Sequence, residues 1–189
     1  MIEDIEVVKN ELKQILSPER YKHSIGVMEK AGELAQIYSV NVNKAMLTAV
    51  AHDIAKEVGD EKSIEYARNN GIGIDSIELE NPYLLHAPVG ADMCKKRYNF
   101  TEEMCRAIAI HTTGDKDMSI FDKIIFLSDK IEKNRTYDIV EEIRNISLQN
   151  LDEAVLLFLN HHIERMIRKD RIIHPKSILC RNTLIKDKE

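Results

Sequence analysis

Six histidine and aspartate residues could carry chemistry, because most of them stand among apolar neighbours on separate segments of the chain. They are His23, His52, Asp53, His86, His111 and Asp129. A carboxylate buried without partners is costly, and a metal ion is one cation that compensates it well. Each of the six residues alone is more often a hydrogen-bonded core residue than a ligand. Together they favour a metal site assembled in the middle of a helical bundle.

The pair His52-Asp53 gives the strongest signal. Residues 44–56 are apolar nearly all round, which is typical of a central, buried helix, and the pair lies inside this stretch. Alone, the pair would be read as a hydrogen-bonded core pair. His86 has a different setting, since it stands just ahead of a helix start predicted at Pro88.

Helical spacing of apolar residues dominates the chain, and β-branched runs are short. Helices are predicted near residues 5–15, 18–38, 44–56, 60–70, 88–98, 101–112, 119–133, 138–147 and 150–169, with a short one after Pro175. Ser17-Pro18 is typical of an N-cap followed by proline in the first helical turn, and Asn41 begins the cap of the third helix. The predicted fold class is therefore all-α: a compact multi-helix bundle with a metal site in its core.

The bulk composition limits the class of protein. The 189 residues include 31% charged and 43% apolar residues, an ordinary composition that fits a single domain over 1–189. With a net charge of −5 and no long basic run, we expect no binding to DNA or RNA through a broad basic face. No apolar run approaches the ~18 residues of a membrane span, so we expect no membrane contact either.

Two features predict a cytoplasmic location. The chain starts with MIEDIEVVKNELKQIL, which is acidic and amphipathic and lacks the basic and apolar regions of a secretory signal. The cysteines are odd in number, form no CxxC pair and are predicted to be free thiols of a reducing compartment. They are Cys94, Cys105 and Cys180.

The order of the candidate ligands resembles a known family. His23, His52-Asp53 and Asp129 follow the pattern of the HD-domain phosphohydrolases, and His86 and His111 match the extra histidines of its two-metal members. The local strings are similar to the YqeK branch, which consists of bacterial symmetrical dinucleoside-tetraphosphate hydrolases with a di-iron centre. These strings are Arg20-Tyr-Lys-His23-Ser, His52-Asp53-Ile-Ala-Lys56, Leu84-Leu-His86-Ala-Pro-Val-Gly90-Ala, His111-Thr-Thr-Gly114 with Met118-Ser119, and Ser128-Asp129-Lys-Ile-Glu-Lys-Asn134-Arg135. The resemblance covers about residues 17–170, which leaves 171–189 as a C-terminal extension.

The resemblance implies two divalent metal ions. Six nitrogen and oxygen ligands divide between two octahedral-type metals, with Asp53 as the bridge. Imidazole and carboxylate ligands without a thiolate suit iron or manganese better than zinc. The family resemblance favours iron.

The resemblance also implies a substrate and a set of residues that act on it. The expected reaction is symmetrical hydrolysis of a dinucleoside tetraphosphate, Ap4A to two ADP, by a hydroxide held at the metals. Asp53, Lys56 and Arg135 are the predicted catalytic residues. The residues predicted to contact the phosphates are Arg20, Lys56, Thr112, Thr113, Gly114 and Arg135. For each cation the plain alternative is a solvated surface charge.

Two lysines depart from the pattern of that branch. Lys133 stands where proline is expected before Asn-Arg, and Lys130 stands where tyrosine is common. Neither lysine is expected to touch a ligand residue, but both are expected to affect the rim of the substrate site.

Other functions stay open at this point. A different HD-type nucleotidase or phosphodiesterase is the first alternative, and a non-catalytic nucleotide-binding protein is the second. The presence of all six ligands argues against the second. The sequence also leaves open whether the chain forms a homodimer. We expect a core or interhelical role for His161 and His162, and we assign no role to His174.

Overall fold

The computed structural model describes residues 4–186, so the two ends of the predicted domain, 1–3 and 187–189, lie outside the described residues. All regular elements in the described range are helical, which confirms the predicted all-α fold class. The α-helices are α1 (Ile5–Ile15), α2 (Pro18–Ile37), α3 (Val42–Ala51), α4 (Asp60–Asn69), α5 (Ser76–Glu80), α6 (His86–Tyr98), α7 (Glu102–Ile110), α8 (Ile120–Ile131), α9 (Val140–Ser147), α10 (Leu151–Arg168) and α11 (Pro175–Lys186). A short 3-10 helix, η1 (Pro82–Leu85), joins α5 to α6.

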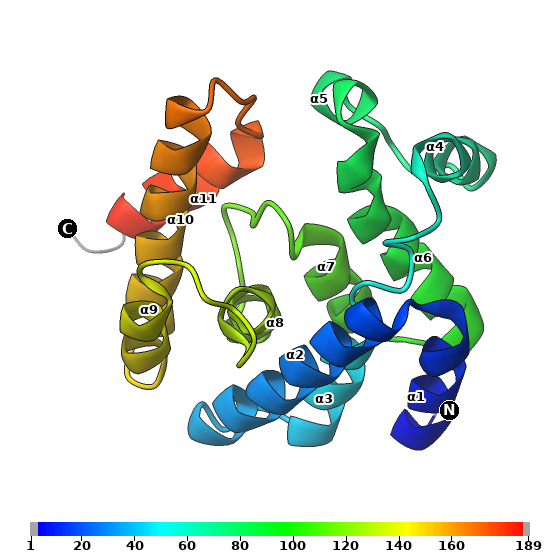
Figure 1. Ribbon diagram of the computed structural model, residues 1–189, viewed down its shortest axis with the longest axis horizontal. Coiled ribbons are helices and arrows are strands. Elements are labelled where there is room, and N and C mark those ends of the chain that lie inside the picture. Colours follow the sequence, from blue (N-terminus) through cyan, green and yellow to red (C-terminus); the bar gives the residue numbers. More distant parts are fainter. Residues whose placement is uncertain (1–3, 187–189) are drawn as a thin grey trace.

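Helices α2, α3, α7 and α8 form the centre of the bundle. Helix α2 packs along α3 and against α8, while α7 packs against both α3 and α8. Helix α6 pairs with α7, and α10 packs on α8, α9 and α11. In Figure 1, α10 and α11 (orange to red) stand on one side of α7 and α8, and α4 and α5 (teal to green) stand on the other. The two outer groups therefore flank the central helices that carry most of the candidate ligands.

The helix starts follow the capping signals in the sequence. The Ser17 side chain caps α2, and Pro18 occupies its first turn, where the missing amide hydrogen costs nothing. The Asn41 side chain caps α3, which begins at Val42, two residues earlier than predicted. No helix among residues 4–186 is both long and apolar enough to cross a bilayer. The three cysteines are buried free thiols, as predicted.

The third helix is shorter than predicted. Helix α3 ends at Ala51 instead of near residue 56, so His52 is its C-cap and Asp53 lies in the turn that follows. The Ala49 carbonyl oxygen is 2.7 Å from His52 Nδ1 and 3.4 Å from the His52 amide nitrogen. In a continuing α-helix this carbonyl would accept from the amide of residue 53. The chain instead continues in tighter turns, with Ile54 N–H donating to the carbonyl of Ala51.

The segment before α6 also differs from the prediction. The sequence analysis placed no element between residues 71 and 87, whereas α5 and η1 lie there, and α6 begins at His86 itself. Pro88 is accommodated because the first amides of a helix have no partner within the helix. Helix α5 is five residues long and stabilised by a capping box between Asp75 and Glu78, so it is too short to carry a readable apolar period.

Helix α8 is covered on nearly every side. Ile124, Ile125, Phe126 and Leu127 are fully buried, and Asp129 follows them on the same helix. The position of this carboxylate therefore depends on how α8 packs.

We predict that Phe126→Ala lowers the free energy of unfolding by about 3–5 kcal/mol, because it leaves a cavity in the centre of the core. Urea denaturation of the metal-free protein measures this. Ile120→Ala on the same helix is the matched control, since Ile120 is 51% exposed, and its effect should stay within about 0.5 kcal/mol. Equal effects of the two substitutions would contradict this description of α8.

Candidate metal centre

Asp53 lies between two pairs of histidines. Its Oδ2 atom is 3.4 Å from His52 Nε2 and 3.9 Å from His23 Nε2. Its Oδ1 atom is 3.4 Å from His86 Nε2 and 3.6 Å from His111 Nε2. The two oxygens of one carboxylate thus face different histidine pairs, as a bridging ligand would.

Asp129 completes one of the two groups. Its Oδ1 atom is 3.0 Å from His23 Nε2 and 3.8 Å from His52 Nε2. We call the group formed by His23, His52, Asp129 and Asp53 Oδ2 the first position. The second position is the group formed by His86, His111 and Asp53 Oδ1, whose two histidine Nε2 atoms are 3.3 Å apart. The structure therefore brings together all six residues that the sequence analysis predicted as ligands.

Three of the four histidines are oriented by a main-chain carbonyl shortly before them in the chain. In each, Nδ1 faces the main-chain carbonyl oxygen three residues earlier, which leaves Nε2 directed at the carboxylates. The pairs are His52 with Ala49 at 2.7 Å, His86 with Tyr83 at 2.5 Å, and His111 with Ile108 at 2.7 Å. A carbonyl only accepts, so Nδ1 carries the hydrogen and Nε2 keeps its lone pair. This is the tautomer that binds a metal through Nε2.

Burial and neighbouring charges shift the protonation of the cluster. Burial opposes ionisation of both carboxyl groups, yet His52 and His111 hold the pKa of Asp53 well below the usual range. The Lys130 ammonium and neighbouring histidines do the same for Asp129. Burial lowers the pKa of His86 to about 3 and also lowers the pKa of His111. Burial acts in the same direction on His52, but the neighbouring Asp53 and Asp129 carboxylates raise its pKa overall, so a metal ion there would replace a proton. Ionised carboxylates and neutral imidazoles are the forms that bind divalent cations.

Three buried atoms of this cluster fit a bound cation. His23 Nε2, His52 Nε2 and Asp53 Oδ1 are inaccessible to solvent and make no hydrogen bond among the described residues. Such atoms are costly to leave unpaired in a protein interior. Two of them belong to the first position and one to the second, so the donor set fits a metal ion in each.

Four cationic side chains surround the two carboxylates. Arg20 Nη1 donates to Asp53 Oδ2 at 2.8 Å, and Arg135 Nη2 donates to Asp129 Oδ1 at 2.7 Å. Lys56 Nζ is 3.0 Å from Nε2 of His86, and burial lowers its pKa to about 8. The fourth cation is Lys130. The site is thus acidic at its centre and basic around it.

The expectation about the contacts of Lys130 was wrong. This lysine was predicted to touch no ligand residue, but its Nζ lies 2.6 Å from Asp129 Oδ2 and 3.1 Å from the His111 carbonyl oxygen. It follows Asp129 directly on α8, and its Nζ also lies 5.1 Å from the centre of the Phe126 ring. Lys133 touches no ligand residue, as expected, but it pairs with Glu29, is largely exposed and does not line the pocket, so its expected place at the rim of the substrate site is wrong.

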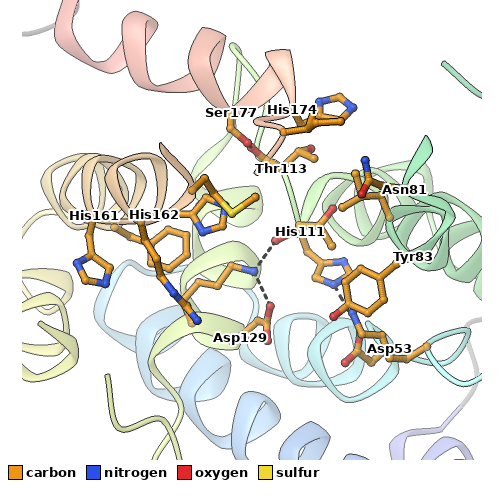
Figure 2. A pocket seen from close by; sticks show the side chains of 18 of the residues that line it. Asp53, Asn81, Tyr83, His111, Thr113, Asp129, His161, His162, His174 and Ser177 are labelled. Atoms are coloured by element: carbon orange, nitrogen blue, oxygen red, sulfur yellow. Dashed lines mark hydrogen bonds and ion pairs between the residues drawn. The ribbon is translucent and has the colours of Figure 1, made fainter. Parts of the chain in front are cut away.

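A pocket of about 520 Å³ opens above the two carboxylates. Asp53 and Tyr83 lie on one side of it, His161 and His162 of α10 lie on the other, and His174 and Ser177 close its far end (Figure 2). The two α10 histidines, which the sequence analysis placed in the core or between helices, thus line the wall of the pocket. Their place follows from the packing of α10 beside α8, which the sequence does not reveal.

The predicted phosphate-contacting residues differ in their position. Arg20, Lys56, Thr112, Thr113 and Arg135 all line the pocket. The Gly114 amide instead donates to the Ile110 carbonyl at 2.8 Å, at a left-handed φ of +68°. That donor is therefore engaged in ending α7, and the role of the glycine is to permit the turn.

A second group of potential ligands lies near the pocket end, where His174 Nε2 is 3.2 Å from Asp75 Oδ2, with Glu78 nearby. His174 is buried, and its Nδ1 accepts a hydrogen bond from the Lys176 amide at 3.2 Å. The ring hydrogen therefore sits on Nε2, directed at Asp75. This is the tautomer opposite to that of the three histidines above, and it does not suit a metal at Nε2.

The comparisons with known proteins agree with this geometry. The sequence profile of the HD domain matches residues 20–134, a range that contains all six candidate ligands. The chain belongs to the HD-domain family. The matched range is shorter than the predicted core of 17–170, so that boundary stays a prediction.

Relatives of this HD-domain chain cover nearly its whole length. It is 35% identical to the symmetrical bis(5'-nucleosyl)-tetraphosphatase of Halalkalibacterium halodurans, over 92% of this chain and 93% of that protein. It is 31% identical to the Bacillus subtilis protein of the same name, over 92% and 94%. A crystal structure of a Clostridium acetobutylicum protein, described as a predicted HD superfamily hydrolase involved in NAD metabolism, shares 35% identity with a TM-score of 0.95 and covers 99% of this chain and 100% of that one. The family resemblance inferred from the sequence is confirmed.

One buried acidic residue near the HD-domain cluster was missed by the sequence analysis. Glu132 is 2% exposed, and its Oε1 lies 3.3 Å from His23 Nδ1. Its sequence neighbours Lys133 and Arg135 suggest a surface segment, so periodicity gives no sign of its burial. A carboxylate at the end of an otherwise apolar helix was the one available signal.

We predict that Mn²⁺ stabilises the wild-type protein by about 2.7 kcal/mol for each position at which it is 100-fold above the dissociation constant. Each such position raises Tm by roughly 5–10 °C for a domain of this size. Asp53→Asn should lose the response, because both positions use this carboxylate. Asp75→Asn is the control and should keep it. Loss of the response in Asp75→Asn alone would place the metal at the other group.

Proposed function

We propose that this chain cuts a dinucleoside tetraphosphate at its centre, giving two nucleoside diphosphates, and that it does so with two divalent metal ions bound by His23, His52, Asp53, His86, His111 and Asp129. The observation that carries the proposal is the division of the two Asp53 oxygens between separate histidine pairs. The names of the relatives support the substrate. Iron is the metal that the family resemblance favours, with manganese as the alternative.

When bound, two metals at these positions supply an activated water and take up charge from the phosphoryl oxygens. The protein supplies the remaining groups. Asp53 fixes the distance between the two positions. Arg135 and Arg20 both line the pocket, and their planar guanidinium groups can each bind a phosphate through two hydrogen bonds. Lys56 adds a compact positive charge beside His86.

The number of cations supports a polyphosphate over a monophosphate. Arg20, Lys56, Lys130 and Arg135 all line the pocket, together with the hydroxyl-bearing Thr112 and Thr113. A single phosphate has too few oxygens to engage all of them, whereas a chain of phosphates can. Binding energy from the outer phosphates can then position the central bond at the metal centre.

The product pattern tests the substrate assignment directly. We expect the manganese- or iron-loaded protein to convert Ap4A into ADP alone, and a reaction in heavy-oxygen water to place the label on one of the two ADP molecules. Chromatography and mass spectrometry of an early time point measure both. Formation of ATP and AMP, or faster turnover of AMP than of Ap4A, would contradict symmetrical cleavage.

Two substitutions distinguish the bridging role of Asp53 from the phosphate contact of Arg135. Arg135→Ala should lower kcat/KM for Ap4A by about 10²–10³-fold, since one charge contact to the reacting phosphates is lost. Asp53→Ala should have a larger effect, because both metal positions are disrupted. Lys133→Ala is the matched control, being a neighbouring cation outside the pocket that pairs with Glu29. The bridging role would be wrong if Asp53→Ala kept a tenth of the wild-type turnover.

An HD-type nucleotidase or phosphodiesterase is the alternative function. The description of the Clostridium acetobutylicum relative as an enzyme of NAD metabolism favours testing NAD and nicotinate nucleotides beside Ap4A. Equal or higher kcat/KM on one of these would replace the proposed substrate and leave the proposed metal centre unchanged. The cytoplasmic location stays a prediction, and whether the chain forms a homodimer stays open.

A further inference from the structure

His23 differs from the other three histidines of the cluster. It lies in the middle of α2, where the main-chain carbonyls already accept the hydrogen bonds of the helix. It therefore has no free carbonyl three residues earlier to orient its ring. Its Nδ1 instead faces the carboxylate of Glu132, at 3.3 Å from Oε1. The first position thus has a carboxylate behind one of its histidines, whereas both histidines of the second position face a main-chain carbonyl through Nδ1.

Glu132 is held firmly in this place. Its other oxygen, Oε2, accepts from the main-chain amide of Asn134 at 2.7 Å and from the side-chain Nδ2 of Asn134 at 2.8 Å. Helix α2 can approach so closely because residue 26 is glycine. A Cβ atom at Gly26 would come within 2.5 Å of Glu132 Oε2. The approach of α2 and the position of the carboxylate therefore depend on each other.

The turn that carries Glu132 is fixed from a second side by Arg144 of α9. Its guanidinium donates to the carbonyl oxygens of Ile131 at 2.8 Å, Glu132 at 2.6 Å and Arg135 at 3.0 Å. The Arg135 amide in turn donates to the Glu132 carbonyl at 2.9 Å. One rigid turn therefore presents Glu132 to His23 and Arg135 to the pocket.

We infer that Glu132 is a positioning residue for the first metal position: by accepting from His23 Nδ1–H it fixes the tautomer and angle of the ring, so that this position binds its metal more tightly than the second. This inference rests on the metal binding of the proposed function. A carboxylate behind a ligating histidine raises the basicity of the ligand and locks its orientation. The second position has no carboxylate behind its histidines, and it offers three ligand atoms where the first offers four.

Glu132→Gln is the informative substitution because it preserves shape and inverts the hydrogen bond. The two Asn134 donors require an acceptor, so the glutamine oxygen takes the place of Oε2. The glutamine amide group then faces His23 and donates to Nδ1. The His23 hydrogen moves to Nε2, which removes the lone pair that the metal needs.

The experiment is calorimetric titration of the full chain with Mn²⁺ alone, together with elemental analysis. We expect wild type to bind two Mn²⁺ per chain with unequal dissociation constants. Glu132→Gln should weaken the tighter of the two by about 10–100-fold and leave the other nearly unchanged. Gly26→Ala should act in the same direction, because the added methyl group displaces the Glu132 carboxylate.

Asp122→Asn is the matched control. Asp122 is another buried carboxylate of α8, 1% exposed, and its partners are Ser119 and Arg106 and none of the candidate metal ligands. The Asp122→Asn substitution should lower the Tm of the metal-free protein and keep both Mn²⁺ affinities. This result would distinguish the loss of a buried charge from the loss of the group that positions His23.

The inference is overturned if Glu132→Gln binds both Mn²⁺ ions as wild type does, or if Asp122→Asn weakens the tighter ion as much. Wild-type protein that binds no Mn²⁺ would overturn the inference and the proposed metal centre together. Wild-type protein that binds two ions but leaves Ap4A intact would refute the proposed substrate alone, because the positioning role is measured by metal affinity and not by turnover.

Discussion

Two ionised carboxylates, Asp53 and Asp129, lie in the interior of a helical bundle, and the surrounding structure compensates their charge. Both hold pKa values well below the usual range despite burial. Removing one partner of a buried ion pair typically costs about 3–5 kcal/mol, so such a cluster persists only when its charges are matched. Arginines and lysines at the pocket rim compensate part of this negative charge, and metal ions at the proposed positions would compensate the rest.

The helices end where this cluster requires it. His52 and His111 are C-caps, and His86 is the first residue of α6, so all three stand where a side chain can reach a main-chain carbonyl three residues earlier. A histidine in mid-helix cannot use this arrangement, and His23 accordingly depends on a separate carboxylate, Glu132. The difference between helix end and helix interior thus accounts for the different surroundings of the two proposed metal positions.

The sequence indicated which six residues would lie together better than it indicated what surrounds them. Asp53 and Asp129 are recognisable because a charged residue inside an apolar run is costly to bury without a compensating partner. The end of α3 at Ala51 was not predictable from periodicity, since it results from a side-chain hydrogen bond of His52. Glu132 was missed because its burial depends on Gly26 of a distant helix, and Lys130 because its contact with Asp129 depends on how a flexible chain folds back.

The residues that form the wall of the pocket were also not predictable from the sequence. His161 and His162 face the pocket because α10 packs beside α8, and His174 does so because it caps α11 and contacts Asp75. Such contacts join residues far apart in the chain and leave no periodic signal. The roles of the individual site residues stay predictions until they are measured.

Anomalous diffraction from crystals of the iron- or manganese-loaded protein tests the central claim most directly. The account predicts two anomalous peaks about 3.5–4 Å apart, one beside His23, His52 and Asp129 and the other beside His86 and His111, with one oxygen of Asp53 bound to each. A single peak, two peaks on the same side of Asp53, or a peak at Asp75 and His174 instead would contradict it.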